Sequence, residues 1–481
     1  MGRKEILRVS SSDLVNEPAT EEFPLSDFDH TLPKIYTLVA LTFQLEDGEN
    51  RQKLIEKLCA GLQLTLSQCR SLRGTLQTDS ESGKLWIRKK KHNTVEFITH
   101  WMDGEDDDDA FPSFEALEKA DFPAGWMDGD ALLPLSVTRK QPLTPLGESG
   151  DDGNPILVVQ ANFIRGGLIL AVAVHHSCSD GPGTDGFLSQ WAENTRSLSA
   201  GTSPLPFDPL VLDRSPLTSH DARGEPPKAG SDSKGPFAFM TVETPPAPPP
   251  DFQMPSLSQV MYHFSTSGIA RLKGDAATVS TYEAMVAILW RCMTRAQVPL
   301  FKPSLSAQTR LLHAVGLRRF VKPPLPARYL GNALALPAPF VDIYALLGDK
   351  DAALRRTAGV IRGSIQEATS EAMIQRTADW IHSVPNKASI SLAINNFMGL
   401  DVAAASWGQM RTYLEQDFGF GLPKALRWPK PMVDGYIFVY PRRPKDEAEE
   451  GVEVCVCLET DCMARLLADE ELAKYAHPRG L

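Results

Sequence analysis

The chain is poor in several features that would point to a common class of protein. Its seven cysteines include no CxxC pair with the spacing of metal ligands, and an odd number without a framework fits a reducing compartment. Lys and Arg (49) are outnumbered by Asp and Glu (60), and the net charge of −11 argues against nucleic acid or an anionic membrane surface as the main partner. No apolar run has the length of a transmembrane helix, and the first residues hold no apolar signal core. We therefore expect a cytoplasmic protein that binds no metal, nucleic acid or membrane.

Length and proline content indicate two domains. A chain of 481 residues exceeds what one hydrophobic core usually organises. Prolines crowd into residues 201–256, including a run at 245–250, and such a stretch behaves as an extended connector rather than as helix or central strand. We therefore predict an N-terminal domain over 1–200, a crossover linker over 201–256 and a C-terminal domain over 257–481.

The spacing of apolar residues predicts the main helices and strands. Residues 1 to about 22 are expected to form a loose arm or an edge strand, and Arg165-Gly166-Gly167 to form the turn of a hairpin. The other elements expected include strands at 36–45, 156–164, 168–174, 435–440 and 451–458, and helices at 50–66, 185–198, 278–295 and 460–475, with a mostly helical region at 350–383.

The most informative stretch runs from Ala171 to Gly186, AVAVHHSCSDGPGTDG. The apolar run 168–174 predicts a buried strand that ends in His175 and His176. Asp180 follows four residues after the second histidine and precedes a Gly-Pro-Gly turn. Histidine has an unperturbed pKa near neutral pH, so an imidazole fixed at a strand end can take a proton from a reacting group. HHxxxDG therefore indicates a general base, with a core histidine satisfied by Asp180 as the alternative.

Other short motifs follow at wide spacing. Residues 417–421 read DFGFG, without the glycine-rich loop, VAIK lysine and HRD of a protein kinase. Residues 405–407 read ASW, residues 323–332 read PPLPARYLGN shortly after Arg318, and residues 25–29 read LSDFD. The sequence holds no GxSxG nucleophile elbow, so nothing indicates a serine-bound intermediate.

Taken together, these motifs resemble the BAHD family of coenzyme A-dependent acyltransferases, with its HxxxD and DFGWG motifs, its TSW segment and its long crossover loop. HHxxxDG also matches the wider chloramphenicol acetyltransferase and peptide-condensation superfamily. The resemblance spans most of residues 24–475 and departs from the family pattern at Phe420, in place of Trp, and at Ala405, in place of Thr. It implies an α/β fold of two chloramphenicol-acetyltransferase-like mixed-sheet domains, with HHxxxDG in the first and DFGFG in the second.

The resemblance also implies a reaction and roles for named residues. The expected reaction moves an acyl group, with acetyl as the expected group, from acyl-CoA to a hydroxyl of a small-molecule secondary metabolite, on a monomer with no bound cofactor and with the site between the two domains. His176 is the expected general base, and Asp180 is expected to turn away from the substrate and pair with Arg318. Trp407 and Ser406 are the candidates for stabilising the oxyanion. Structural support of the site is assigned to Arg318, Gly181, Asp417 and Gly419.

Several alternatives stay open on the sequence alone. His175 is the alternative base, although the superfamily pattern assigns this role to the second histidine, and Cys178 is the candidate for a covalent intermediate. The other functions to separate are an N-acyltransferase, a free-standing condensation-type domain with a carrier-protein donor, and a non-catalytic ligand-binding protein. The acceptor is not named by the sequence, because loops rather than the fold determine specificity.

Overall fold

The computed structural model describes residues 2–104, 111–138, 153–219, 234–242, 255–277, 280–304, 306–429, 433–444 and 450–480, so the proline run at 245–250 lies outside the described residues. The chain folds into two compact units. Unit 1 comprises Met1–Thr218, Lys322–Ala333 and Gln409–Lys430, and unit 2 comprises Ser219–Val321, Leu334–Gly408 and Pro431–Leu481. Two segments that follow the proline-rich stretch in sequence thus pack in unit 1. DFGFG, which we expected in the C-terminal domain, lies in one of them.

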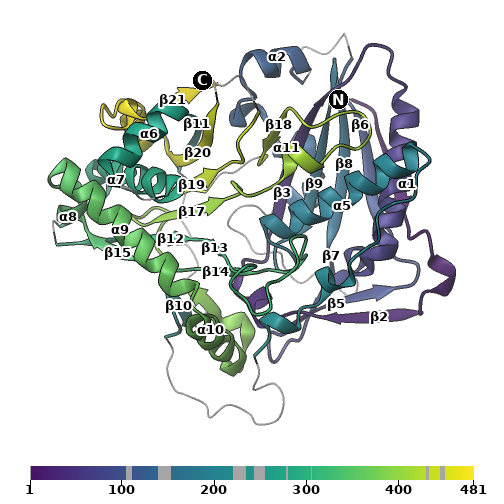
Figure 1. The fold of residues 1–481 in the computed structure, drawn as a ribbon, viewed down its shortest axis with the longest axis horizontal. Coiled ribbons are helices and arrows are strands. Elements are labelled where there is room, and N and C mark those ends of the chain that lie inside the picture. Colours follow the sequence, from purple (N-terminus) through teal and green to yellow (C-terminus); the bar gives the residue numbers. More distant parts are fainter. Residues whose placement is uncertain are drawn as a thin grey trace. The chain divides into compact units, whose positions relative to one another are not determined.

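Unit 1 is built on a six-stranded sheet in the order β1-β6-β8-β9-β3-β18 (Figure 1). Its centre is the predicted hairpin of β8 and β9, in which Leu157 pairs with Val174 and Ile164 with Gly167. Every residue of both strands is buried, so both faces of the hairpin are covered. β1 is the edge strand, which is one of the two structures expected for the N-terminal residues. The strands span Lys4–Val9 (β1), Tyr36–Gln44 (β3), Val95–Trp101 (β6), Leu157–Ile164 (β8), Gly167–His175 (β9) and Ala425–Arg427 (β18).

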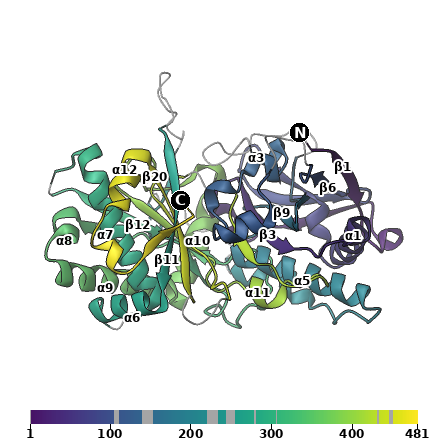
Figure 2. The same ribbon diagram turned by 90° about the horizontal axis from the view of Figure 1, so that it is seen from above.

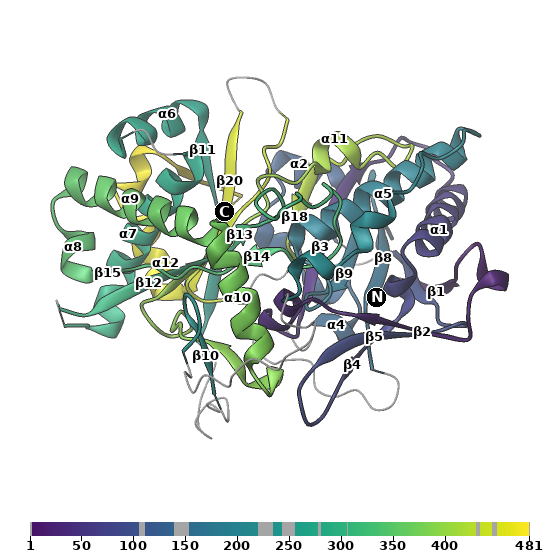
Figure 3. The same cartoon turned by 60° about the horizontal axis from the view of Figure 1, so that its bottom comes forward.

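Two long helices of unit 1, α1 (Arg51–Gln68) and α5 (Gly181–Ser199), pack against each other on one face of this sheet (Figure 1). The indole of Trp191 on α5 contacts Phe97 of β6 and donates a hydrogen bond to the carbonyl oxygen of Leu58 on α1, 2.9 Å away. A second, antiparallel sheet has the order β2-β5-β4-β7 (Figure 3). Its strands and the remaining helices of unit 1 are Thr20–Pro24 (β2), Thr75–Thr78 (β4), Leu85–Lys90 (β5), Asn154–Pro155 (β7), Phe114–Lys119 (α2), Gly129–Leu132 (α3), Leu135–Thr138 (α4) and Thr412–Glu415 (α11).

Unit 2 contains a seven-stranded sheet in the order β15-β12-β17-β19-β20-β11-β21, in which β17 runs parallel to both β12 and β19. Helices α6, α7 and α9 lie side by side (Figure 2). Two pairs of short strands, β10 with β16 and β13 with β14, complete the unit. The strands span Phe239–Thr241 (β10), Leu257–Ser265 (β11), Gln308–His313 (β12), Val315–Gly316 (β13), Leu334–Ala335 (β14), Phe340–Asp342 (β15), Ile390–Leu392 (β16), Val402–Ser406 (β17), Tyr436–Val439 (β19), Gly451–Glu459 (β20) and His477–Arg479 (β21). The helices span Thr266–Asp275 (α6), Thr281–Phe301 (α7), Ile343–Leu347 (α8), Lys350–Ala368 (α9), Glu371–Ser383 (α10) and Thr460–Leu467 (α12).

Helix ends in unit 2 follow local hydrogen bonding. Ser280 and Glu283 form a capping box at the start of α7, in which the Ser280 hydroxyl accepts from the Glu283 amide at 3.3 Å and the Glu283 carboxylate accepts from the Ser280 amide at 3.1 Å. The closing helix α12 is shorter than predicted, since it ends at Leu467. The carboxylate of Asp469 accepts from the amides of Glu471 and Leu472, and this local turn replaces the helical bonds.

No helix in the described part of the chain is both long and apolar enough to cross a membrane.

Candidate active site

The end of β9 delivers two histidines with different surroundings. His175 pairs with Tyr36 of β3, and their rings meet edge to face at 5.2 Å. The Nδ1 atom of His175 accepts a hydrogen bond from the Ser177 amide at 3.3 Å, and the side chain is buried. Burial, together with the neighbouring charges of His176 and Lys34, lowers the pKa of His175 to about 3. His175 is therefore a neutral, buried side chain.

His176 is the single residue between Gly167 and Asp180 that is only partly buried. Its Nδ1 atom lies 3.2 Å from the carbonyl oxygen of Ser179. A carbonyl oxygen only accepts hydrogen bonds, so Nδ1 carries the proton and Nε2 carries the lone pair. Desolvation by burial lowers the pKa of His176, and the charge of Asp180 partly opposes this shift. A neutral imidazole with its lone pair on Nε2 is the form that a general base needs.

We expected the Gly-Pro-Gly sequence after Asp180 to form a separate turn before the helix, and this prediction is wrong. The sequence forms the first turn of α5, which begins at Gly181. Asp180 is the N-cap residue of this helix, and its Oδ1 atom accepts from the Gly183 amide at 2.8 Å. Asp is favoured at the N-cap and Pro in the first turn, which explains the earlier start. The second oxygen, Oδ2, accepts from the Ala333 amide at 2.9 Å. The pairing of Asp180 with Arg318, which belongs to unit 2, stays a prediction.

The segment before Ala333 crosses directly over the first turn of α5. A Cβ atom on Gly183 would lie 2.5 Å from the Ser179 hydroxyl and 2.7 Å from the Leu330 carbonyl oxygen. The backbone of the 322–333 segment can approach the helix this closely because position 183 has no side chain.

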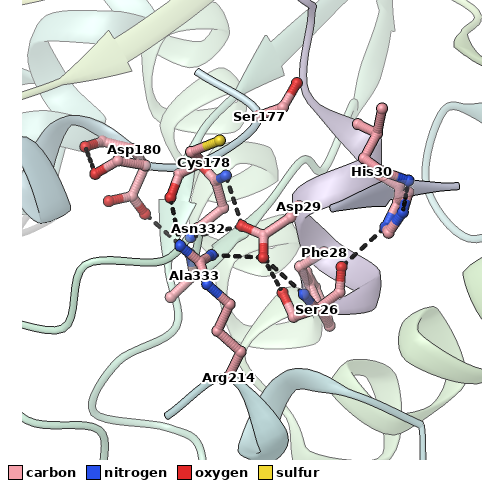
Figure 4. A network of polar contacts seen from close by, with 12 residues as sticks. Ser26, Phe28, Asp29, His30, Ser177, Cys178, Asp180, Arg214, Asn332 and Ala333 are labelled. Carbon is pink, nitrogen blue, oxygen red and sulfur yellow. Dashed lines mark hydrogen bonds and ion pairs between the residues drawn. The ribbon is translucent and has the colours of Figure 1, made fainter. Parts of the chain in front are cut away.

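Asp29, which we had not counted among the site residues, lies at the centre of a buried network (Figure 4). Its Oδ1 atom accepts from the amide and the side-chain nitrogen of Asn332, at 3.0 and 2.7 Å. Its Oδ2 atom accepts from the amide and hydroxyl of Ser26, at 2.7 and 2.8 Å, and from the guanidinium of Arg214 at 2.6 Å. We call these four residues the Asp29 network. The LSDFD and GN motifs contained three of its members, whereas nothing in the sequence indicated Arg214.

The Asp29 network reaches the HHxxxDG loop at two backbone carbonyls. The side-chain nitrogen of Asn332 donates to the carbonyl oxygen of His176 at 2.9 Å, and the guanidinium of Arg214 donates to that of Cys178 at 2.8 Å. Burial raises the pKa of the Cys178 thiol, so this group stays protonated and is a poor nucleophile. Nowhere in the described ranges do three or more His, Cys, Asp or Glu side chains gather as ligands for a metal ion.

Trp407 and Ser406 belong to unit 2 and stand at the carboxyl end of β17. The Trp407 ring packs edge to face on Phe438 at 4.4 Å, and its amide donates to the carbonyl oxygen of Val439 at 2.8 Å. The Ser406 hydroxyl accepts from the Gly408 amide at 3.2 Å. Loops after the carboxyl ends of parallel strands are common places for binding residues, and β17 is parallel to both of its neighbours.

The DFGFG motif forms a tight turn in unit 1. The Oδ1 atom of Asp417 accepts from the amides of Gly419 and Gly421, at 2.7 and 3.0 Å. Both glycines have positive φ, 93° and 98°, which is a conformation that other residues rarely adopt.

Phe418, between Asp417 and Gly419, is fully buried. Its ring packs edge to face on Trp191 at 5.1 Å and on Phe43 at 5.9 Å. Phe43 pairs with Leu168, whereas His175 pairs with Tyr36 at the other end of the same two strands. The two pairs are seven steps apart along the strands, which is roughly 23 Å. DFGFG therefore lies at the far end of the β3–β9 pair from the histidines.

Comparisons with known proteins identify the family of this chain. The model of the Transferase family matches residues 130–473, and that of the trichothecene 3-O-acetyltransferase-like N-terminal domain matches residues 35–193. The acetyltransferase FGR3 of Gibberella zeae is 31% identical over 97% of this chain and 92% of its own length. The trichothecene 3-O-acetyltransferase of Fusarium sporotrichioides is 26% identical over 92% of this chain and 94% of its own.

Solved structures share the fold. TRI101 of F. graminearum, complexed with coenzyme A and T-2 mycotoxin, superposes with a TM-score of 0.76 at 21% identity and covers 95% of this chain and 99% of its own. Vinorine synthase superposes with a TM-score of 0.67 at 18% identity, over the whole of both chains. With a family model matching well over half of its length, this chain belongs to the Transferase family of BAHD-like acyltransferases and has their fold of two mixed-sheet, chloramphenicol-acetyltransferase-like domains.

Proposed function

We propose that this enzyme transfers an acetyl group from acetyl-CoA to a hydroxyl group of a small-molecule secondary metabolite, with His176 as the general base. The observation that carries the proposal is the state of His176, which is partly exposed and has its Nδ1 proton held by the Ser179 carbonyl. The donor is supported by relatives named as acetyltransferases and by the solved TRI101 structures that hold coenzyme A.

In the proposed reaction, Nε2 of His176 takes the proton of the acceptor hydroxyl while the oxygen attacks the thioester carbonyl carbon. The tetrahedral intermediate then breaks its C–S bond, and the coenzyme A thiolate takes the proton from the imidazolium. The products are an acetate ester and free coenzyme A, and the histidine returns to its neutral form. General-base catalysis of this kind contributes about 10²- to 10⁴-fold to the rate. We propose direct transfer, since burial raises the pKa of the Cys178 thiol and disfavours the thiolate that a covalent intermediate on this residue would need.

The oxyanion of the intermediate needs a hydrogen-bond donor, and one such donor contributes about 3 kcal/mol. We keep Trp407 and Ser406 as candidates for this role. Their support is the match to the TSW segment and their place after the carboxyl end of β17. Ala405, where the family has Thr, offers no hydroxyl.

The test is a screen of the purified enzyme with acetyl-CoA and a panel of hydroxylated terpenoids, alkaloids and polyketides, with detection of the added acetyl group by mass spectrometry. A trichothecene alcohol belongs in the panel because two of the relatives are named trichothecene 3-O-acetyltransferases. Parallel arms with amine acceptors and with acetyl loaded on a carrier protein separate N-acylation and condensation-type transfer. We expect turnover with acetyl-CoA and an alcohol; turnover with the carrier-bound donor alone would contradict the proposal.

A further inference from the structure

The buried carboxylate of Asp29 takes no part in the proposed reaction, yet it organises the backbone on which the reaction depends. We infer that Asp29 is a positioning residue for His176, acting through Asn332 and Arg214. This inference rests on the proposed role of His176 and adds to it a set of residues that fixes where the imidazole points.

The contacts form two relays from one carboxylate. Asn332 uses its side-chain nitrogen twice, toward Oδ1 of Asp29 at 2.7 Å and toward the carbonyl oxygen of His176 at 2.9 Å. Arg214 places one guanidinium nitrogen on Oδ2 of Asp29 at 2.6 Å and the other on the carbonyl oxygen of Cys178 at 2.8 Å. Each relay therefore ends on a peptide group of the HHxxxDG loop.

The relays leave His176 little freedom. Its amide donates to the carbonyl oxygen of Ile35 at 2.8 Å, so its backbone is held on both sides, by the residue before β3 and by Asn332. The orientation of the Asn332 amide is fixed because both partners of its nitrogen can only accept. Without the carboxylate, the side-chain nitrogen of Asn332 would lose one of its two acceptors, and Arg214 would keep a mostly buried positive charge with no counter-ion in this network.

The residues of the Asp29 network come from distant parts of the sequence, at 26–29, 214 and 332, and all lie in unit 1. A second buried ion-pair cluster in unit 1 supplies a control. There Glu17 pairs with Arg73 and Lys89, and all three side chains are buried. The ion pairs described for this cluster end on residues outside the HHxxxDG loop. If Asp29 had a purely structural role, substitutions in the two clusters would affect stability and kcat in the same way.

The kinetic experiment compares Asp29→Asn, Asn332→Ala and Arg214→Lys with the control Glu17→Gln. The Asp29 carboxylate is the acceptor in all five hydrogen bonds described for it, and each of its oxygens accepts at least two. The side-chain amide introduced by Asp29→Asn would therefore point its NH₂ group at hydrogen-bond donors in either orientation. We expect Asp29→Asn to lower kcat by up to about 100-fold through misplacement of His176, with KM for acetyl-CoA little changed. Glu17→Gln should lower the unfolding midpoint and leave kcat of the folded enzyme unchanged.

A second readout does not depend on the acceptor. In enzyme labelled with ¹³C-histidine, the signal of His176 is assigned by its loss in His176→Gln. We expect Asp29→Asn and Asn332→Ala to change the chemical shift and the titration midpoint of this signal, and Glu17→Gln to leave both unchanged. Asn332→Ala keeps the ion pair of Asp29 with Arg214, so it supplies the measurement if Asp29→Asn does not fold.

The outcomes separate the two claims. An unmoved His176 signal in the folded variants overturns the positioning role, whatever the enzyme acetylates. A moved signal combined with undiminished turnover of His176→Ala leaves the positioning intact and overturns the proposed role of His176 as the base.

Discussion

Unit 1 holds two glycine-containing motifs at opposite ends of the β3–β9 pair, and different forces hold them. The HHxxxDG loop is fixed by directional hydrogen bonds from Asn332, Arg214 and Ala333 to its carbonyl and carboxylate oxygens. The DFGFG turn is fixed by the buried ring of Phe418 and by one carboxylate that accepts two amides.

The difference indicates which motif can perform chemistry. The His176 imidazole stays partly exposed, with its Nδ1 proton on the Ser179 carbonyl, which fits its proposed role as the base. Ring packing instead buries the Phe418 side chain completely, which stabilises the fold and offers no reactive group. The comparison predicts that one motif controls the rate and the other controls stability.

The largest effect is expected from His176→Ala. Removal of the base should lower kcat by about 10²- to 10⁴-fold, because the acceptor hydroxyl then has to lose its proton to water. The unfolding midpoint should change little, since the side chain is partly exposed. Steady-state kinetics on protein of unchanged circular dichroism checks this, and near-normal turnover would rule His176 out as the base.

Phe418→Ala should show the opposite behaviour. Truncation of a fully buried Phe costs about 3–5 kcal/mol of unfolding free energy, because the rings of Trp191 and Phe43 lose their contacts. The kcat of the folded enzyme, measured well below the lowered midpoint, should stay close to normal. A large fall in kcat at full folding would show that the two motifs are coupled, and would break the comparison.

The pH profile sharpens the assignment of the reactive motif. The base must be neutral, so activity is constant above the pKa of His176 and falls as the pH drops through it. Burial lowers this pKa, which places the fall in kcat/KM below the ordinary histidine value of about 6.5. The profile in His176→Ala should lose this acidic limb. An acidic limb above the ordinary value would contradict the environment described for His176.

Local patterns of the sequence predicted much of the fold. The hairpin of β8 and β9 follows from two apolar runs around a glycine turn, and α1 follows from leucines at helical spacing. The start of α5 was misplaced, because the Gly-Pro-Gly sequence was interpreted as a turn although Asp180 before it is a good N-cap residue. The family and its fold were identified from motifs, and the comparisons confirm both.

The Asp29 network could not be predicted, for a physical reason. Its members lie far apart in the sequence, and a single sequence does not say which buried polar groups meet. Arg214 follows a short 3-10 helix in a stretch interpreted only as a linker, and its two partners are a carboxylate and a backbone carbonyl. Burial of the Asp29 carboxylate requires these donors, and only the folded chain supplies them.

The smallest effects come from a matched pair of aspartates, one in each motif. Asp180 uses both oxygens, Oδ1 for the Gly183 amide and Oδ2 for the Ala333 amide. Asp417 uses Oδ1 alone for the amides of Gly419 and Gly421. An asparagine has one acceptor oxygen, so it can replace Asp417 in these contacts but not Asp180.

Asp180→Asn should therefore destabilise unit 1 by about 1–3 kcal/mol, because one buried amide faces an NH₂ group, and it should also lower kcat through the loop that carries His176. Asp417→Asn should change the unfolding free energy by no more than about 0.5 kcal/mol and leave kcat unchanged. Chemical denaturation and steady-state kinetics on the two variants measure both quantities. Equal losses would mean that the number of acceptor oxygens is not what distinguishes the two carboxylates. A loss of stability without a loss of kcat in Asp180→Asn would separate the start of α5 from the placement of His176.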